Sequence, residues 1–299
     1  MGTGVLQRLD RAQKDRVWLA VAVATAKKFS EDQSANLAAM IAFWAFFSVF
    51  PLFLVLVTLL AIFLPDSDKN SVLGHVAQLF PLLDPRSVSG LSGAWWTIVL
   101  GLATALWSGS GVVRTAQFAL NSVWGITPDH QPGLVKQLSR SVVVLATVGA
   151  GLVITTLLSG LVASSASGVH LGIVGRIAGY VLSAALDVGI FLAAFRILTD
   201  REVTSRDVLP GALLSGIAFF VLQLLSTLLI SRYLKNAQST YGRFATVITI
   251  LWWFYLQSMI TMLGAQLNVV LKKHDYPRSL TKAPNAAADD TSSATAEDR

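Results

Sequence analysis

The sequence predicts an all-α polytopic integral membrane protein with six transmembrane helices and both termini in the cytoplasm. Three observations predict this class. Of the 299 residues, 54% are hydrophobic and only 13% are charged, whereas a soluble domain carries roughly 25% charged residues. Six apolar stretches are each long enough to cross a hydrocarbon core of about 30 Å as a helix. The Lys and Arg residues gather at alternate ends of these stretches, as membrane orientation requires.

Residues 1–35 precede the first apolar stretch and are predicted to form an amphipathic helix on the cytoplasmic face. Apolar side chains such as Leu6, Val17 and Val21 recur at three- and four-residue spacings among six Lys and Arg residues. This pattern is typical of a helix that lies in the membrane interface. A helix packed on the protein's own cytoplasmic loops would show the same pattern, so both alternatives stay open. No cleaved signal peptide is expected, because a short apolar run with a small-residue cleavage site is missing.

The first predicted span covers residues 37–64 and contains a proline. As a continuous helix it would be about 42 Å long, which exceeds the hydrocarbon core and requires the helix to tilt, kink or protrude. Pro51 removes one backbone hydrogen bond near the middle. We therefore expect a kink between Phe47 and Pro51, with the Ser48 hydroxyl satisfying a freed carbonyl. Such a kink serves either packing alone or function.

Five further spans complete a single membrane domain over residues 36–273. They are predicted at 94–113, 141–162, 173–198, 210–230 and 244–268. After the second span, residues 114–124 continue as a more polar helix that leaves the membrane. Pro210 stands in the first turn of the fifth span, where proline is favoured, and residues 232–243 form an external loop. The tail, residues 274–299, is rich in Ala, Ser, Thr and Asp and is predicted to be disordered.

The distribution of positive charge sets the predicted orientation. With both termini inside, seventeen of the 23 Lys and Arg residues fall in cytoplasmic segments. The six external ones are Lys69, Arg86, Arg176, Arg232, Lys235 and Arg243. Because basic residues favour the cytoplasmic side, both termini are predicted to be cytoplasmic, which requires an even number of spans. Orientation accounts for the net charge of +6, and no nucleic-acid partner is expected.

Several short motifs stand in order along residues 35–270. They are Ala-Phe-Trp-Ala-Phe-Phe-Ser-Val-Phe-Pro at 42–51, Ala-Leu-Asn at 119–121, Pro-Gly-Ala at 210–212, Tyr-Gly at 241–242 and Gly-Ala-Gln-Leu-Asn at 264–268. With this set of motifs the chain resembles the YihY/BrkB family of bacterial inner-membrane proteins, once mislabelled as ribonuclease BN. The resemblance implies six transmembrane helices, a link to envelope integrity and a transport role for lipid-like or other envelope substrates.

Within these motifs and spans we assign structural roles to Pro51, Pro210, Gly242 and Gly264. One position departs from the pattern of the family. The closing motif usually contains Glu, and Gln266 stands there in this chain. A proton-carrying role that needs a carboxylate at this position is therefore not supported.

Asp187 is the strongest candidate for a functional residue. It lies near the middle of the span at 173–198, where a carboxylate costs at least about 2.5 kcal/mol to insert. It either faces a central cavity that takes a substrate or a proton, or it hydrogen-bonds to a neighbouring helix. Arg114, Gln117 and Asn121 share one helix face. They either line the cytoplasmic mouth of this cavity and meet an anionic headgroup, or they form a solvated helix end.

Three uncharged polar residues lie within or near the last two spans: Gln223, Gln257 and Gln266. They are candidates for the cavity wall and equally for interhelical hydrogen bonds. No catalytic residue, metal or cofactor is predicted. The four histidines are scattered over loops on both sides of the membrane. Neither a phosphate-binding loop nor a nucleophile motif occurs, and the chain has no cysteine.

Two functions follow from these observations. The first is a transporter or flippase-like protein that handles a lipidic or amphipathic envelope component in a cavity around Asp187. The second is a non-transporting membrane scaffold that stabilises the envelope or recruits partners. A deep cavity at Asp187 favours the first, and a solid bundle in which a neighbour caps Asp187 favours the second. Membrane lipids, anionic ones among them, are the expected partners, and homo-oligomer formation stays open.

Overall fold

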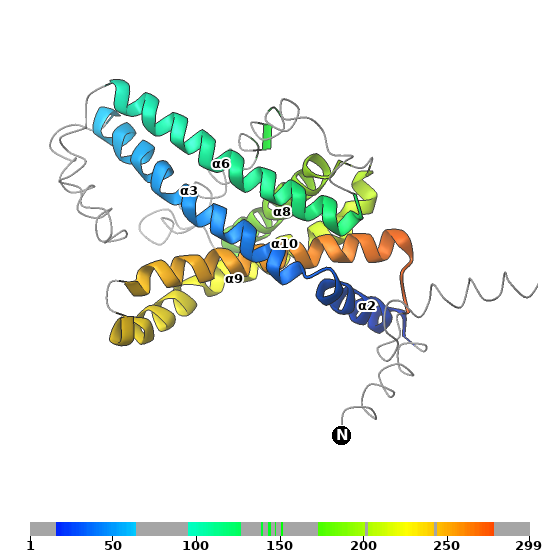
Figure 1. The fold of residues 1–299 in the computed structure, drawn as a ribbon. Coiled ribbons are helices and arrows are strands. Elements are labelled where there is room, and N and C mark those ends of the chain that lie inside the picture. Colours follow the sequence, from blue (N-terminus) through cyan, green and yellow to red (C-terminus); the bar gives the residue numbers. More distant parts are fainter. Residues whose placement is uncertain are drawn as a thin grey trace, which may run out of the picture.

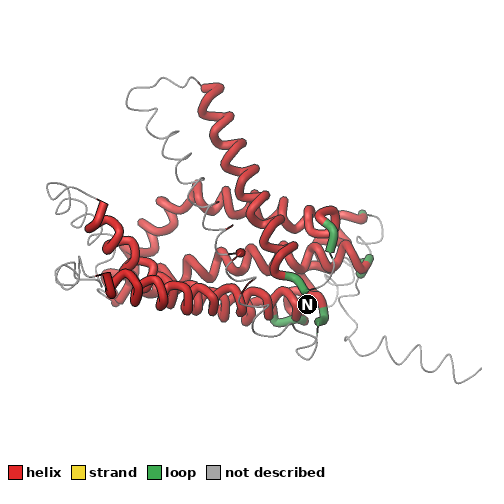
Figure 2. Tube along the Cα trace, turned by 90° about the horizontal axis from the view of Figure 1, so that it is seen from above, coloured by secondary structure: helices red, strands yellow, loops and turns green. Residues whose placement is uncertain are grey.

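The computed structural model describes residues 16–63, 95–126, 173–200, 203–241 and 244–277, with a few single positions between 139 and 151. Within these residues the chain is helical and contains no strand, which confirms the predicted all-α class for this part (Figure 1). The helices are α2 (Val17–Glu31), α3 (Ser34–Phe63), α6 (Trp95–Trp124), α8 (Ile173–Leu198), α9 (Ser205–Tyr241) and α10 (Phe244–Lys273). Residues 32 and 33 form the turn that joins α2 to α3, and Figure 2 shows the described chain as helices with short loop segments and no strand.

Three of the described helices contain segments with the length and composition of membrane spans. Three segments are long and apolar enough to cross a membrane: Ile177–Leu198, Ser205–Leu225 and Val247–Lys273. Large apolar side chains point outward, among them Val181 on α8, which is 63% exposed, and Trp107 on α6, which is 61% exposed. An outer surface this apolar is stable in lipid and not in water. The described part is therefore that of a helical membrane protein.

Most helices pack in antiparallel pairs, and α10 connects the pairs. Trp44 of α3 lies against Trp107 of α6, with ring centroids 6.2 Å apart. Phe191 of α8 lies against Phe219 of α9, with ring centroids 5.8 Å apart. α10 packs along α9 on one side and along α3 and α2 on the other. In Figure 1, α3 and α6 run together to the upper left, while α9 and α10 run together to the lower left.

Small residues bring α9 and α10 into direct backbone contact. A Cβ atom added to Gly211 would fall 2.5 Å from the Asn268 side chain and would also clash with the carbonyl oxygen of Gly264. Asn268 Oδ1 accepts a hydrogen bond of 2.6 Å from the Gly211 backbone N–H. The Ser215 hydroxyl donates one of 3.1 Å to the Ile260 carbonyl. Close contact through small residues is a common way for helices to associate in membranes.

An open groove of about 340 Å³ runs between α3 and α10. Ala39 and Ala42 border it on α3, and Ile248, Leu251 and Tyr255 border it on α10. The small side chains of the two alanines leave this groove open.

The start of α9 differs from the prediction. The helix begins at Ser205, so Pro210 lies beyond the first turn. The reason is an N-terminal helix cap at Thr204, which was not predicted because Pro210 suggested a later start. Thr204 donates hydrogen bonds from its backbone N–H and its hydroxyl to Asp207 Oδ2, at 2.9 and 2.8 Å. A Thr and an acidic residue at this spacing are typical of a helix start.

Two other details differ from expectation. Residues 232–241, predicted as a loop, continue α9 as helix. They contain basic residues but neither Pro nor Gly, so nothing in this stretch breaks the helix. α3 continues through Pro51 as the predicted single span requires, and the kink stays a prediction, but the predicted partner of Ser48 was wrong. The Ser48 hydroxyl donates to the Ala45 carbonyl at 2.7 Å, and not to the Phe47 carbonyl, which is the one that the proline leaves without its helical donor.

Some predictions concern residues outside the described part. These are the helix over residues 1–15, the loop at 65–93, the structural role of Gly242 and the tail from residue 278 onward. In the predicted third span, 141–162, the structure describes Val143, Val144, Thr147 and Gly151.

Candidate functional site

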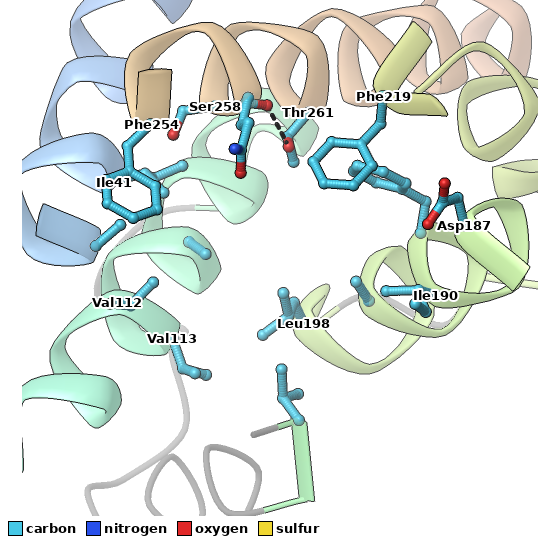
Figure 3. A pocket seen from close by; sticks show the side chains of 16 residues that line it. Ile41, Val112, Val113, Asp187, Ile190, Leu198, Phe219, Phe254, Ser258 and Thr261 are labelled. Atoms are coloured by element: carbon cyan, nitrogen blue, oxygen red, sulfur yellow. Dashed lines mark hydrogen bonds between the residues drawn. The ribbon is translucent and has the colours of Figure 1, made fainter. Parts of the chain in front are cut away.

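A largely apolar cavity of about 300 Å³ lies where α3, α6, α8, α9 and α10 meet. Figure 3 shows its wall, with Phe254, Ser258 and Thr261 from α10 on one side and Asp187 with Phe219 on another. The polar lining residues are Asp187, Gln257, Ser258 and Thr261. Three alanines, one each on α3, α6 and α8, contribute to the open volume: Ala45, Ala116 and Ala194. The cavity therefore suits an apolar group that carries a polar part.

Asp187 stands on this wall with a single protein partner in the described part of the chain. Its side chain is buried, with 2% of the residue exposed, and Gln223 of α9 donates a hydrogen bond of 3.4 Å to its Oδ2 atom. A close approach of α8 and α9 brings the two side chains together, because a Cβ on Gly216 would fall 2.6 Å from the Val188 Cα atom. A carboxylate accepts up to about four hydrogen bonds, so Asp187 keeps capacity for a ligand.

Gln257, Ser258 and Thr261 form a polar strip on the α10 side of the cavity. The Thr261 hydroxyl donates a hydrogen bond of 2.9 Å to the Gln257 carbonyl, as the dashed line in Figure 3 shows. Such a bond within one helix satisfies the hydroxyl proton. The polar groups of the cavity thus come from two walls, with aromatic and aliphatic side chains between them. Gln257, Gln223 and Asp187 are the predicted site residues that the structure brings together.

Arg114 lies on the other side of α6. Its side chain is exposed and borders a separate groove with Met40 and Trp44 of α3. The guanidinium donates from Nε to the Ser110 carbonyl at 3.3 Å and from Nη2 to the Ser110 hydroxyl at 3.4 Å. The structure therefore does not bring Arg114 to the carboxyl of Asp187.

Gln117, Asn121 and Gln266 are buried away from the lining of the cavity. Gln117 is 3% exposed, and neither end of its side-chain amide has a hydrogen-bond partner in the described residues. Asn121 donates to Asp200 Oδ2 at 2.6 Å and accepts from the Asp200 backbone N–H at 2.9 Å. Gln266 Nε2 donates to Asp32 Oδ2 at 2.9 Å and to Ser34 Oγ at 2.7 Å. Asn121 and Gln266 therefore join separate elements.

These contacts belong to a polar end layer at one end of the bundle. We define it as Asp32, Asn121, Asp200, Asp207, Gln266, Lys272 and Lys273. The Lys272 ammonium lies 2.7 Å from Asp207 Oδ1, and the Lys273 ammonium donates to the Trp124 carbonyl at 3.4 Å. α3 and α9 begin at this layer, whereas α6, α8 and α10 end there. The layer fixes the relative height of these helices, and with it the position of the cavity.

Several residues of the site were not among those predicted from the sequence. Ser258 and Thr261 could have been found, because polar residues at 257, 258 and 261 share one face of an otherwise apolar helix. The three alanines carry no signal of their own. The partnership of Asn121 with Asp200 spans 79 positions of the chain, and no local pattern indicates it. Among the described residues, no three His, Asp or Glu side chains gather as metal ligands would.

Comparisons with known proteins agree with this architecture. The family model of the virulence factor BrkB matches residues 25–290. The ribonuclease-like protein YfkH of Bacillus subtilis strain 168 is 25% identical over 262 residues, which cover 82% of this chain and 93% of YfkH. No solved structure shows significant similarity to the chain.

Two relatives bear the name UPF0761 membrane protein. The one from Azotobacter vinelandii is 24% identical over 81% of this chain, and the one from Albidiferax ferrireducens is 26% identical over 89%. The aligned regions cover 60% and 66% of these two relatives, so both are longer proteins than this chain. The names of the two UPF0761 relatives describe membrane proteins, and the name of YfkH is ribonuclease-like.

Proposed function

Because this chain belongs to the BrkB family and is a multi-pass bacterial membrane protein, we propose that it is a transporter or flippase-like handler of a lipidic or amphipathic envelope component. The observation that carries this proposal is the apolar cavity with the Asp187 carboxyl on its wall. An ionisable residue inside a membrane span is costly and by default marks a substrate pathway or a pairing. Here the carboxyl would hold the polar part of a ligand whose apolar part fills the cavity.

The lining also indicates the chemistry of that polar part. The described cavity residues include one carboxyl, one amide and two hydroxyls, and no basic side chain. An anionic headgroup would meet the Asp187 carboxylate without a compensating cation. A hydrogen-bond donor such as an amine or a hydroxyl would instead complete the acceptor capacity that Gln223 leaves unused. The proposed ligand is therefore an amphiphile with a donor group, handled without a catalytic step.

We propose six spans with both termini in the cytoplasm. The alternation of helix ends at the polar end layer supports this topology, because α6 and α8 both end there and the chain must cross the bundle between them. A span at 141–162 would make this crossing. Val144 lines the cavity, and a Cβ on Gly151 would fall 2.7 Å from the Ile190 side chain. Lys272 and Lys273 favour a cytoplasmic location for the polar end layer.

Native mass spectrometry of the detergent-purified protein tests the proposal. Wild type is compared with Asp187→Asn, which removes the charge, and with Ala194→Phe, which fills the cavity. Ala185→Phe is the matched control, because Ala185 is an exposed residue of the same helix. We expect wild type and the control to retain a defined amphiphile, and both cavity variants to lose most of it. Equal retention by all four proteins, or no defined ligand in wild type, would overturn the proposal.

A membrane scaffold is the second candidate. The observation that favours it is the polar end layer, in which Asn121 and Gln266 make contacts between elements. A scaffold would translocate nothing. Reconstitution into vesicles separates the two functions: a transporter moves a labelled amine-bearing lipid across the bilayer and loses this activity in Asp187→Asn. A scaffold leaves the distribution of the lipid unchanged with either protein.

A further inference from the structure

We propose that the protein has a second lipid site, on the outward side of the α3–α6 pair, where Arg114 binds the phosphate of an anionic phospholipid. The site is a groove of about 260 Å³. It is lined by Met40, Trp44, Gly111, Arg114, Thr115 and Phe118. The proposal does not depend on the cavity at Asp187, because the two sites share no lining residue.

The two sites lie on different faces of one helix. Val112, Val113 and Ala116 of α6 line the cavity, whereas Arg114 and Phe118 line the groove. Side chains three or four positions apart share a helix face, so Arg114 and Phe118 stand together and away from the cavity. An anion on Arg114 would therefore contact α3 and the surrounding lipid, and not the ligand of the cavity.

Among the described residues, Arg114 has no counter-charge. Its described hydrogen bonds go to the carbonyl and the hydroxyl of Ser110, and no carboxylate of the described residues lies within ion-pair distance. A guanidinium stays protonated in proteins and offers five N–H donors in a planar fork that matches a phosphate. Arg114 lies seven residues before Asn121 of the polar end layer, which is about 10 Å along the helix axis. A headgroup phosphate at the membrane interface is within reach of a side chain at this depth.

The apolar part of the groove commits the site to a lipid and not to free phosphate. Met40 and Phe118 are 45% and 38% exposed beside the cation. The Trp44 ring is held in place on one side of the groove. It packs against Trp107 and so closely against Gly111 that a Cβ atom on this glycine would clash with the ring. A cation next to an apolar groove on a lipid-facing surface complements the phosphate and acyl chain of a phospholipid. Inorganic phosphate would leave the apolar part unused.

The test is a titration of the full chain in detergent with phosphatidylglycerol or phosphatidylcholine, read by native mass spectrometry. We expect wild type to prefer phosphatidylglycerol and Arg114→Gln to lose this preference by about fivefold. Arg114→Lys should keep it, which guards against a trivial effect of misfolding. Arg196→Gln is the matched control, because Arg196 bonds to Ser205 near the end of α8 and lies outside the groove.

The outcomes separate this site from free anion binding and from the cavity. Excess inorganic phosphate should not displace phosphatidylglycerol from wild type. Asp187→Asn should bind phosphatidylglycerol like wild type, and Arg114→Gln should still retain the ligand of the cavity. The proposal is overturned if Arg114→Gln keeps the preference, if the control loses it equally, or if inorganic phosphate competes fully.

Discussion

Two glutamines of α10 that look alike in the sequence have different surroundings in the fold. Gln257 lines the cavity, whereas Gln266, nine residues later, is fully buried and donates to Asp32 and Ser34 at the turn between α2 and α3. The amide is suited to this place because it faces a carboxylate and a hydroxyl and can donate to both. A carboxylate at position 266 could not donate to Asp32, and the two carboxylates would have to share the Lys28 ammonium, which lies 2.6 Å from Asp32 Oδ2.

This geometry predicts the effect of Gln266→Glu. The change replaces a donor by a second negative charge at 2.9 Å from Asp32, so we expect a loss of about 1–3 kcal/mol in the free energy of unfolding. Thermal unfolding in detergent measures it. The double variant Asp32→Asn/Gln266→Glu restores a donor–acceptor pair and should recover much of the loss. A single variant as stable as wild type would contradict the role assigned to Gln266.

The glycines give a second prediction at this scale. Gly211→Ala puts a methyl group against the Gly264 carbonyl and the Asn268 side chain, and overpacking of this kind costs about 1–3 kcal/mol. Gly189→Ala is the matched control, because a Cβ there meets nothing within 4 Å, and alanine is favoured over glycine in a helix by about 0.5–1 kcal/mol. Thermal unfolding should therefore shift downward for the first variant and not for the second. Equal shifts would show that α9 and α10 tolerate separation.

Such residues can be recognised as candidates from the sequence, but the residues that they contact often cannot. Asp187 was recognisable, because a carboxylate in the middle of an apolar span is rare. The different roles of Gln266 and Gln257 were not recognisable from the sequence. Gln266 hydrogen-bonds to Asp32, which lies 234 positions away in the chain, whereas Gln257 lines the cavity. Arg114 was grouped with Asn121 by helical spacing, yet the neighbours of α6 separate the two. Helical periodicity gives the face of a residue but not the element that this face meets.

At the scale of elements, the ends of helices determine how the bundle is held together. The lengths of α8 and α10 follow from apolar runs that the sequence shows directly. The start of α9 does not, because Pro210 is a strong local signal, while the Thr204–Asp207 cap is a weaker one that decides the outcome. The far end of α9 also differs from the prediction, because the polar and basic residues after 231 continue the helix to Tyr241. Charge marks contact with water or headgroups, and a helix can continue through it.

The contact between the end of α6 and the segment after α8 can be measured as a coupling. Asn121 and Asp200 exchange two hydrogen bonds, so Asn121→Ala and Asp200→Ala should each destabilise the protein. The double variant should lose less than the sum, with a coupling energy of about 0.5–3 kcal/mol. Chemical or thermal unfolding of the four proteins gives this value. Ser122→Ala, at an exposed neighbouring position, should have little effect, and additive losses would contradict the coupling.

At the scale of the whole molecule, composition predicted a membrane protein, because so few charges cannot cover a soluble surface, and the length of the apolar stretches predicted that it is helical. The arrangement of the helices was beyond the sequence. Ala45, Ala116 and Ala194, on three different helices, all line the cavity, and their small side chains leave space in it. The relative height of these helices is fixed by the polar end layer, whose members come from segments distant in the chain. Residues that are ordinary in isolation define the site once the fold brings them together.

The proposed topology has a direct test, since the natural chain contains no cysteine. Single cysteines replace Lys69 in the predicted external loop and Asp275 after α10. In intact cells with a permeable outer layer, a membrane-impermeant maleimide should label position 69. It should label position 275 only after the membrane is opened. The reverse pattern would invert the orientation, and labelling of both positions from outside would contradict an even number of spans.

The backbone contact between α9 and α10 has a mechanical consequence. Helices that touch at Gly211 and Gly264 and share the Asn268 hydrogen bond cannot slide past each other without losing that bond, so they behave as one stiff plate. Between α3 and α10 an open groove lies beside Ala39 and Ala42, where side chains have room to move. A displacement of α3 relative to α10 would change the width of the cavity, because Ile41 of α3 and Phe254 of α10 both line it. The glycines between α9 and α10 would thus hold these two helices together and leave movement to the other helix pairs.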